Sequence, residues 1–323
     1  MKNKTSNLTY HDIKKATNLS IGTISRFFNN GSISQKAKTK IENYIQATNY
    51  QPNLGAKLIK GSENCIYLII CSLDDSSNMV IVNSIIDAFK KQAINVYLVV
   101  ASYNPDHYLD VLKSTILRKP KTLILFLPTL NEHLKNFIDQ IEIATYVFGN
   151  NLTNKTTISL DNQNYFFNLT KTIINTKQFN KIVYVGKDLD DWETGKLRLE
   201  GFQKAIELNP LIESQVILIK VNNFLELANH QELQKIIKNV DKNVFIICGT
   251  HTIFEYLFLQ QIKNNYQYQL SDIGYQSKYD YLHQTYQYKV FIDFYYIGYL
   301  IYKKIINCEE QNLLIKEKII ARQ

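Results

Sequence analysis

The chain has 323 residues, of which 45% are hydrophobic and 20% are charged, an ordinary balance for a globular protein. Its length suits two or three domains rather than one. No run reaches the ~18 apolar residues that a membrane span requires, and the N-terminus has no apolar signal region. We therefore expect a cytoplasmic protein with no membrane partner.

The positive charge is concentrated in the first fifth of the chain. Residues 1–61 contain ten Lys/Arg and two Asp/Glu, whereas residues 62–323 contain 27 of each kind, so the net charge of +8 belongs to the first segment. A solvated surface would scatter such charge, whereas a surface that meets phosphate groups concentrates it. The charge distribution therefore favours a nucleic-acid-binding head.

Three short helices are expected in this basic head, each preceded by a residue that can cap it. The expected spans are 10–17 after Thr9 with Asp12 as its capping-box partner, 21–28 after Ser20, and 35–48 after Ser34. The sequence Asn29-Asn30-Gly31 suits the end of the second helix. Two helices separated by a tight turn inside a basic segment predict a helix-turn-helix.

Residues 50–61 predict a conditional helix. Pro52 can begin a helix and Gly61 can end it, while Gly55 in between costs roughly 1 kcal/mol relative to alanine. So short a helix is not stable in isolation, so we expect it to fold only when a partner holds it. An ordinary linker with incidental helix propensity is the alternative.

From Cys65 onward, short apolar runs alternate with amphipathic segments. The expected strands are 66–71, 96–101, 122–127, 145–148, 157–160, 181–185, 216–220 and 244–248. The expected helices are one that ends at 92, then 108–117, 134–141, 165–175, 195–206, 225–238 and 253–263. This alternation indicates parallel sheets in βαβ units, and residues 62–323 suit two stacked α/β lobes better than one sheet.

Catalytic and metal-binding patterns are not found. The sequence contains no phosphate-binding glycine loop, no dinucleotide fingerprint, no nucleophile elbow and no zinc-protease motif. Its four cysteines form no C-x-x-C pair, and its six histidines are scattered. The acidic doublets Asp74-Asp75 and Asp190-Asp191 are more typical of solvated loops than of catalytic pairs. We expect no enzyme activity, no cofactor and no metal.

Many positions of the head match one family signature. They are Thr9-Tyr10-His11-Asp12-Ile13, Ala16, Leu19-Ser20, Thr23-Ile24-Ser25-Arg26, Asn29, Ile33-Ser34, Thr39, Ile41, Asn49-Tyr50-Gln51-Pro52-Asn53 and Ala56. This pattern resembles the LacI/GalR, or lactose-repressor, family almost position for position. Fainter similarity continues through Leu160-Asp161-Asn162, Arg198-Leu199-Glu200-Gly201-Phe202, Asp272-Ile273-Gly274-Tyr275 and Ile319-Ile320-Ala321-Arg322-Gln323, and so covers essentially the whole chain.

The resemblance implies an α/β fold with an N-terminal all-α helix-turn-helix head and a bilobed core like the periplasmic binding proteins, with two parallel-sheet, Rossmann-like lobes. The expected domains are the head at 1–49, a hinge helix at 50–61 and an effector-binding and dimerisation core at 62–323. Within the core, the first lobe is expected over about 62–159 plus 293–310 and the second over about 160–290 plus 315–323. These bounds follow from the resemblance and the element pattern together.

The resemblance also implies which residues contact DNA. They are Thr9, Ser20, Ile21, Gly22, Thr23, Ser25, Arg26 and Asn29 in the head, and Asn53, Ala56 and Ile59 in the hinge. Arg26 is the only arginine of the head and can address a guanine bidentately. Ile21 and Gly22 cannot hydrogen-bond through a side chain, and the hydroxyl and amide groups suit phosphates. Ile59, seven residues after Pro52, would be an apolar wedge in the minor groove.

For the effector, the resemblance implies a site between the lobes that contains Asp75, Asp161, Arg198, Phe224, Thr250 and Gln276. Arg198 would bind ligand hydroxyls and Phe224 would stack on the ligand, although a core phenylalanine is the alternative. The family usually has Asn-Asp where this chain has Thr250-His251, and a carboxylate where it has Gln276. This less acidic pocket could accommodate a phosphorylated sugar. It could also mean that the response to a ligand has been lost.

We therefore predict a sequence-specific repressor that binds a pseudo-palindromic DNA operator as a homodimer, because the chain ends at Gln323 without the added helix of the family's tetramers. A small carbohydrate or sugar-phosphate effector would control it. A global carbon-catabolite regulator with a phosphoprotein corepressor is one alternative. A cytoplasmic sugar-binding protein or sugar enzyme without a DNA role is another, and the head's charge of +8 disfavours it.

Overall fold

The structure is a computed structural model of the 323-residue chain. It describes residues 8–28, 31–50, 65–73, 76–92, 94–149, 152, 154–187, 193–219, 230–239, 243–266, 268–275, 286–316 and 318–321. The chain forms two compact units, Met1–Glu63 with Leu117–Lys119 and Asn64–Ile116 with Pro120–Gln323. Among the described residues, no helix has the length and apolar character needed to cross a bilayer.

The first unit contains the three expected helices with the expected bounds: α1 (Tyr10–Thr17), α2 (Ile21–Phe28) and α3 (Gln35–Thr48). One apolar residue of each helix is fully buried, namely Ile13, Ile24 and Ile41, and Tyr50 closes the small core they form. The helix ends are decided locally, which is why the sequence located them. Ser34 Oγ accepts the N–H of Ala37 at 3.3 Å at the start of α3.

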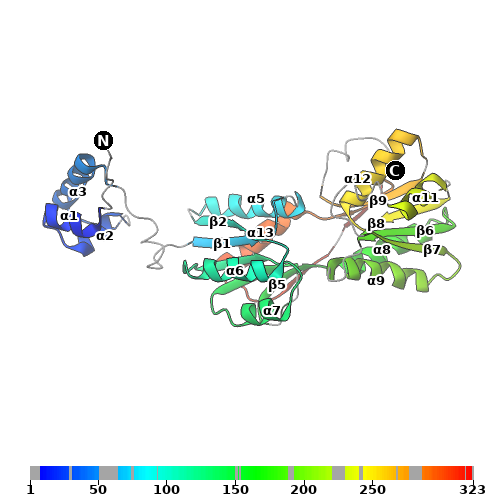
Figure 1. The fold of residues 1–323 in the computed structure, drawn as a ribbon, viewed down its shortest axis with the longest axis horizontal. Helices are drawn as coiled ribbons and strands as arrows, with labels where there is room; N and C mark the ends of the chain where they lie inside the picture. Colours follow the sequence, from blue (N-terminus) through cyan, green and yellow to red (C-terminus); the bar gives the residue numbers. More distant parts are fainter. Residues whose placement is uncertain are drawn as a thin grey trace. The chain divides into compact units, whose positions relative to one another are not determined.

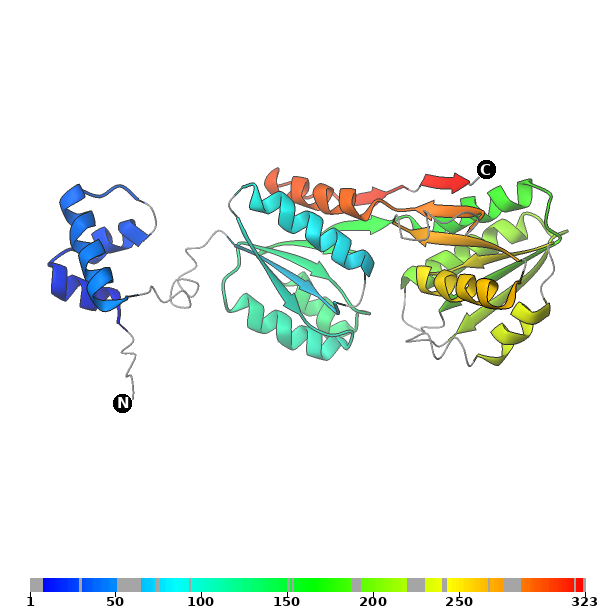
Figure 2. The same ribbon diagram turned by 90° about the horizontal axis from the view of Figure 1, so that it is seen from above.

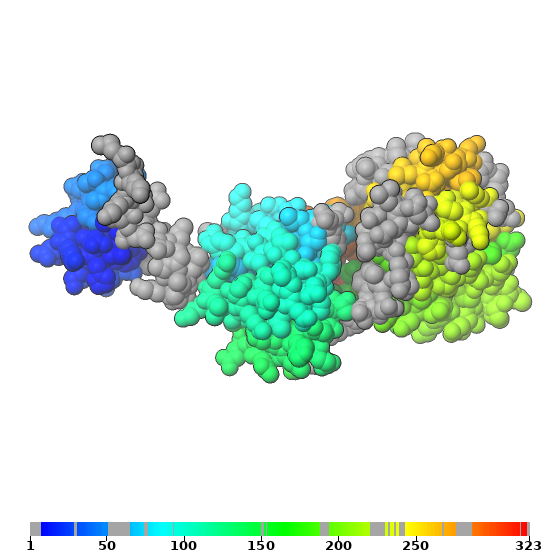
Figure 3. All heavy atoms as spheres, in the orientation of Figure 1, coloured from blue at the N-terminus to red at the C-terminus, as the bar shows by residue number. Residues whose placement is uncertain are grey.

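The first lobe of the second unit is a six-stranded, all-parallel sheet (Figure 1). Its strands are β1 (Cys65–Ile70), β2 (Asn95–Val100), β3 (Thr122–Phe126), β4 (Ala144–Phe148), β5 (Thr156–Leu160) and β11 (Leu313–Ile315), in the order β11-β5-β4-β3-β1-β2. Helices α5 (Ser76–Lys90) and α13 (Phe294–Ile306) lie side by side on one face, with α6 (Pro105–Ile116) and α7 (Glu132–Asp139) on the other (Figure 2). Side chains of α5, α6 and α7 form much of the face of this lobe seen in Figure 3.

The second lobe has a six-stranded sheet in the order β12-β10-β9-β8-β6-β7, parallel except for its edge strand β12. Its strands are β6 (Lys181–Lys187), β7 (Glu213–Ile219), β8 (Val244–Cys248), β9 (Gln269–Gly274), β10 (Tyr288–Phe291) and β12 (Lys318–Ala321). Its helices are α8 (Asn162–Asn175), α9 (Glu193–Glu207), α11 (Gln231–Asn239) and α12 (His251–Asn264). The predicted α/β fold with two parallel-strand sheets is confirmed.

The chain passes between the two sheets three times: after β5, between β10 and α13, and between β11 and β12. Helix α13 therefore follows a strand of the second sheet but packs against α5 of the first lobe. Each sheet is completed by a strand from the last part of the chain. The three connections begin at the carboxyl ends of parallel strands, the edge where α/β proteins place their ligands.

Most expected boundaries in the core shift by one to three residues, and α6 and α8 each begin three residues earlier than expected. Two further differences have a cause that the structure shows. The helix expected from residue 225 begins, among the described residues, at Gln231, because His230 Nδ1 accepts the N–H of Leu233 at 3.3 Å and caps the helix there. The strand expected from Val216 begins three residues earlier at Glu213, because it pairs in register with β6 from Lys181 onward. The local apolar pattern could identify neither the His230 cap nor the pairing of β7 with β6.

Glycine at position 201 is required by a close helix approach. A Cβ at Gly201 on α9 would lie 2.1 Å from the carbonyl oxygen of Gln163 and 3.0 Å from the backbone nitrogen of Phe167, both on α8. Because both obstacles are backbone atoms, α8 and α9 would have to separate. This contact sets the position of α9 over the second sheet.

We expect Gly201→Ala to lower the free energy of unfolding by about 1–3 kcal/mol, the usual cost of overpacking a core. Urea denaturation followed by circular dichroism measures it. Gly22→Ala is the matched control, because a Cβ at Gly22 meets only Ser20 Oγ, at 3.7 Å. That change should be neutral or stabilising by up to about 1 kcal/mol. Equal effects of the two substitutions would contradict the close-approach assignment.

Candidate functional site

Helix α2 presents one face to solvent and buries the other. Ile24 is fully buried in the head, whereas Gly22 and Arg26, one helical turn apart, are exposed. Ile21 and Ser25 are half-buried beside them. The residues expected to read DNA bases therefore lie on a single accessible face of α2.

The start of α2 is held by its own hydroxyl groups. Ser20 Oγ accepts the N–H of Thr23 at 3.1 Å, and the two hydroxyl oxygens of these residues lie 2.9 Å apart. At the start of α1, Asp12 Oδ2 accepts both the N–H and the hydroxyl of Thr9, each at 2.8 Å. These predicted DNA contacts thus serve as helix caps in the protein alone, a role that is compatible with contacting a phosphate.

The described surface of the head is strongly basic. It contains six Lys and Arg side chains against two carboxylates, and the basic groups are exposed. They are Lys14, Lys15, Arg26, Lys36, Lys38 and Lys40. Gly31 lies close to Arg26: it donates its N–H to the Arg26 carbonyl at 2.7 Å, and a Cβ at Gly31 would lie 3.2 Å from the arginine Cβ.

A second group of polar side chains lies at the carboxyl edge of the second sheet. Arg198 on α9 is only 8% exposed. Its Nε donates to Asn162 Oδ1 at 2.9 Å, and its Nη1 donates to the Gly249 carbonyl at 2.7 Å. The guanidinium carbon also lies 5.6 Å from the centre of the Phe166 ring. Arg198 is thus fixed in orientation by contacts within the protein.

The loop after β8 approaches β6 closely. The N–H of Gly249 donates to the Val185 carbonyl at 2.7 Å, and a Cβ at Gly249 would lie 2.8 Å from the Tyr184 hydroxyl oxygen. Burial raises the pKa of Tyr184 to about 12, and the nearby Arg198 guanidinium partly opposes that rise. Glycine at this position therefore lets the loop bring its carbonyl to Arg198.

Two of the expected effector residues are helix caps. Asp161 Oδ1 accepts the N–H of Asn164 at 3.4 Å at the start of α8, and Thr250 Oγ1 accepts the N–H of Ile253 at 3.3 Å at the start of α12. With Arg198, they come from the ends of β5 and β8 and from α9. Seven expected site residues lie outside the described residues: Asn29, Asn53, Ala56, Ile59, Asp75, Phe224 and Gln276.

Sequence reasoning missed a buried charged group beside this edge. Asp272 on β9 and Lys289 on β10 are 0% and 1% exposed, and Lys289 Nζ lies 3.0 Å from Asp272 Oδ2. His251, the first residue of α12, has its Nδ1 2.8 Å from Asp272 Oδ1. The sequence did contain a signal for this group, because Asp272 and Lys289 are charged residues within short apolar runs. Such residues are rarely fully buried unless they are paired.

The environment of His251 raises the pKa of its imidazole. Burial of the ring opposes this, since it favours the neutral form, but the hydrogen bond and the negative charge of Asp272 outweigh burial, with Glu255 adding to them and Lys289 opposing. Glu255 Oε1 lies 3.8 Å from His251 Nε2. The folded protein therefore holds the imidazole proton more tightly than the unfolded chain does.

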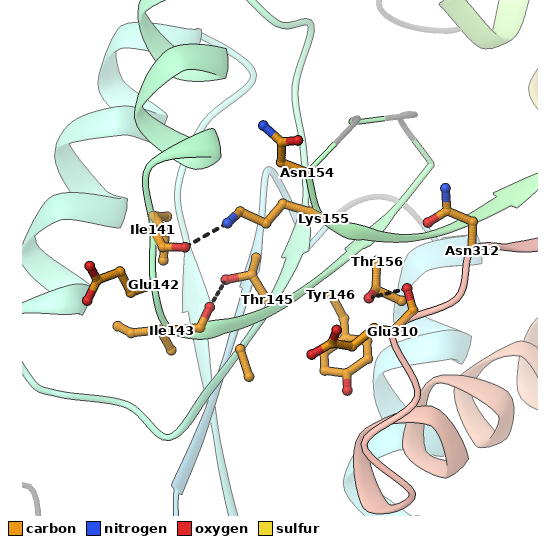
Figure 4. Close-up of a pocket in the computed structure, with 11 residues that line it drawn as sticks. Ile141, Glu142, Ile143, Thr145, Tyr146, Asn154, Lys155, Thr156, Glu310 and Asn312 are labelled. Carbon is orange, nitrogen blue, oxygen red and sulfur yellow. Dashed lines mark hydrogen bonds between the residues drawn. The ribbon is translucent and has the colours of Figure 1, made fainter.

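A groove of about 460 Å³ lies elsewhere, at the amino ends of β4 and β5 in the first lobe (Figure 4). Lys155 donates its ammonium to the Ile141 carbonyl at 2.6 Å, and the Thr156 hydroxyl donates to the Glu310 carbonyl at 3.1 Å. None of the expected effector residues lines it. Within the described part of the chain, no group of three or more His, Cys, Asp or Glu side chains could hold a metal ion.

Comparison with known proteins identifies transcription regulators that are similar to this chain. No family model matches the chain. It is 23% identical to the HTH-type transcriptional regulator MalR of Staphylococcus xylosus over 248 residues, which are 72% of this chain and 73% of that protein. It is 25% identical to the sucrose operon repressor of the same organism over 214 residues, 65% of this chain and 66% of that protein. The chain is thus similar in sequence to sugar-operon repressors and other HTH-type transcriptional regulators.

Solved structures agree on the fold. A LacI-family transcriptional regulator from Silicibacter pomeroyi superposes with a TM-score of 0.80 at 17% identity, over 97% of this chain and 98% of that one. The lac repressor dimer bound to operator and an anti-inducer superposes with a TM-score of 0.76 at 14% identity, over 98% of each chain. Because the curated LacI-type relatives are transcription regulators, the prediction that the chain is not an enzyme is confirmed.

The pKa of His251 predicts a pH dependence of stability. A pKa raised in the folded state stabilises the protein below the unfolded pKa of about 6.5, and this contribution is lost as pH rises through the folded value. We expect the free energy of unfolding to fall across that window, and His251→Gln to flatten the fall. Urea titrations at a series of pH values measure it. His133→Gln, on the exposed surface of α7, should keep the wild-type slope; a flat wild-type profile would refute the assignment.

Proposed function

We propose that the protein is a sequence-specific DNA-binding transcription repressor whose hold on its operator is controlled by a small carbohydrate or sugar phosphate. The observation that carries the proposal is the exposed face of α2, with Gly22 and Arg26 accessible on a unit whose described surface is strongly basic. A helix of this kind enters the major groove and reads base edges with the residues near its start. The basic side chains around it would neutralise phosphates.

The partner is a pseudo-palindromic DNA site bound by a homodimer. In HTH repressors a two-fold axis of the protein matches two half-sites of the operator, so each head contacts one half. Residues 50–61 would form the hinge between the head (1–49) and the core (62–323), and they lie outside the described residues apart from Tyr50. In this proposal the hinge helices fold only in the minor groove, with Ile59 as an apolar wedge.

The effector would bind between the two lobes of the core, against the carboxyl edge of the second sheet. Arg198 supports an anionic ligand, because its positive charge is already oriented by Asn162 and Gly249. Ligand binding would change the packing of the lobes and thereby the hinge equilibrium, which is thermodynamic linkage between two sites. The Staphylococcus xylosus relative named as a sucrose operon repressor supports a sugar as the ligand class.

The first test concerns base reading. We expect Arg26→Ala to weaken operator binding by about 1–3 kcal/mol and to change binding to random DNA little, because a bidentate base contact discriminates by that amount. Gel shifts with DNA upstream of the gene supply the measurement. Lys60→Ala is the control, since loss of a phosphate contact weakens all sequences and reduces the salt slope. Equal losses on operator and random DNA would make Arg26 a phosphate contact.

The second test concerns the hinge. If Ile59 is a wedge, Ile59→Ala should reduce DNA bending and operator affinity, because an inserted apolar side chain unstacks and kinks the duplex. The melting temperature of the core should stay unchanged. A circular-permutation gel measures the bend. Unaltered bending would remove the wedge from the mechanism while leaving the role of α2 intact.

The third test concerns the ligand. We expect a disaccharide phosphate to bind at least about tenfold more tightly than its neutral parent, since one charge-assisted hydrogen bond contributes ~1.5–3 kcal/mol. Calorimetric titration with matched pairs, beginning with sucrose and sucrose 6-phosphate, measures the ratio. Arg198→Lys keeps the positive charge but removes the planar guanidinium, whose N–H groups have fixed directions. It should therefore reduce the ratio of the two affinities. Equal or tighter binding of the neutral sugar would disprove a phosphorylated effector.

A further inference from the structure

We propose that Asp272 and Lys289 are a buried positioning pair that holds the His251 ring with its Nδ1 proton on Asp272, so that Nε2 selects the effector by charge. The inference deepens the proposed function and rests on it for the location of the ligand. Neither Asp272 nor Lys289 would touch the ligand. They act through His251, which begins α12 at the carboxyl edge of the second sheet.

The pair is part of the sheet itself. Asp272 and Lys289 are register partners on the neighbouring parallel strands β9 and β10, and both are essentially excluded from solvent. Asp272 Oδ2 accepts no well-aligned hydrogen bond in the described structure, so the 3.0 Å contact with Lys289 Nζ is chiefly Coulombic. Burying two charges costs desolvation energy that their attraction offsets only with good geometry. An apolar pair would fill this space at lower cost.

The other carboxylate oxygen decides which ring nitrogen of His251 carries a proton. Asp272 Oδ1 accepts the backbone N–H of Ile273 at 2.7 Å and lies 2.8 Å from His251 Nδ1. A carboxylate paired with an ammonium is an acceptor only, so Nδ1 must be the donor in that contact. The neutral ring then has an acceptor at Nε2, and the protonated ring has a donor there.

His251 lies where a ligand could reach it. Its side chain is 29% exposed. It comes two residues after Gly249, whose carbonyl accepts a hydrogen bond from Arg198. The same short loop therefore connects the fixed guanidinium to the imidazole. A ligand on this edge would meet both groups.

The charges around His251 come close to cancelling when the ring is protonated. The groups that face it are Glu255 on its own helix, Asp272 on β9 and Lys289 on β10. With a neutral ring, these three carry a net charge of −1, and protonation brings the cluster to zero. The thiol of Cys248 on β8, next to Asp272, stays protonated, because burial and the carboxylate raise its pKa. The donation from Nδ1 to Asp272 is common to both protonation states, so the charge balance is what favours an imidazolium, whose Nε2 lies 3.8 Å from Glu255 Oε1.

The consequence is a charge filter that depends on pH. Protonated Nε2–H donates to an anionic group, such as a phosphate ester, and a neutral Nε2 accepts from a sugar hydroxyl instead. Removing the negative charge of Asp272 should lower the pKa of His251, and removing Lys289 should raise it. A pair that merely fills the core would not produce opposite shifts.

The decisive experiment is a pH titration of the histidine ring signals by nitrogen NMR on the full-length protein, with the signal of His251 assigned from its absence in His251→Gln. We expect Asp272→Asn to lower the midpoint of His251 and to populate the Nε2–H tautomer, and Lys289→Met to raise the midpoint. Ser271→Ala is the control. It removes a buried hydroxyl that accepts from Cys248 N at 3.1 Å but no charge, so the midpoint should not move.

If Asp272→Asn or Lys289→Met alone fails to fold, a double variant still tests the inference. The double variant Asp272→Asn with Lys289→Met leaves no unpaired buried charge, and its His251 midpoint should lie below that of wild type. An unchanged midpoint and tautomer in Asp272→Asn or in the double variant would overturn the inference.

Measuring ligand affinity against pH distinguishes a failure of this inference from a failure of the proposed function. Sucrose 6-phosphate should lose affinity as pH rises through the His251 midpoint, and Asp272→Asn should move that loss to lower pH. The ester's own second ionisation near pH ~6 is common to both proteins and cancels in their ratio. Identical pH curves for the two proteins would overturn the inference. Absence of binding to sucrose and its phosphate, with the NMR shifts present, would count against the proposed effector instead.

Discussion

A single buried guanidinium connects three segments of the chain at the ligand edge of the second lobe. Arg198 belongs to α9 and donates to Asn162 at the start of α8 and to Gly249 after β8. A charge this deeply buried is stable only while its donors are satisfied, so displacing any of the three segments leaves a costly unpaired group. The arrangement of α8, α9 and the loop into α12 therefore depends on this side chain.

The close contacts nearby serve the same arrangement. Gly201 lets α9 lie directly against the backbone of α8, and Gly249 lets its loop lie against Tyr184. With a methyl group at either position, the distances from Arg198 to Asn162 or to the Gly249 carbonyl would lengthen. For the proposed effector site this rigidity has a use, because a ligand gains affinity when the groups that bind it are already oriented.

The two units depend on different forces. The head has a small apolar core around Ile13, Ile24 and Ile41 and a surface with excess positive charge, which the phosphates of the proposed DNA partner would compensate. The core unit has balanced charge and large apolar clusters on its sheets. One costly feature of its described part, the Asp272–Lys289 pair, lies beside the edge where a ligand is proposed, a place where proteins commonly retain groups that weaken the fold.

The sequence by itself determined the three helices of the head, the alternation of strands and helices and the family resemblance. Those features follow from neighbouring residues: Ser20 and Ser34 cap the helices that begin beside them, and apolar periodicity identifies buried faces. The Arg198 contacts with Asn162 and Gly249, and the triad of His251, Asp272 and Lys289, were decided only by the tertiary structure. The two residues in each of these contacts are separated by 17 to 51 positions, and no local pattern states which strands will pair or in what register. A charged residue inside an apolar strand, such as Asp272, indicates that an oppositely charged partner is needed. Only the order of the strands in the sheet identifies that partner as Lys289.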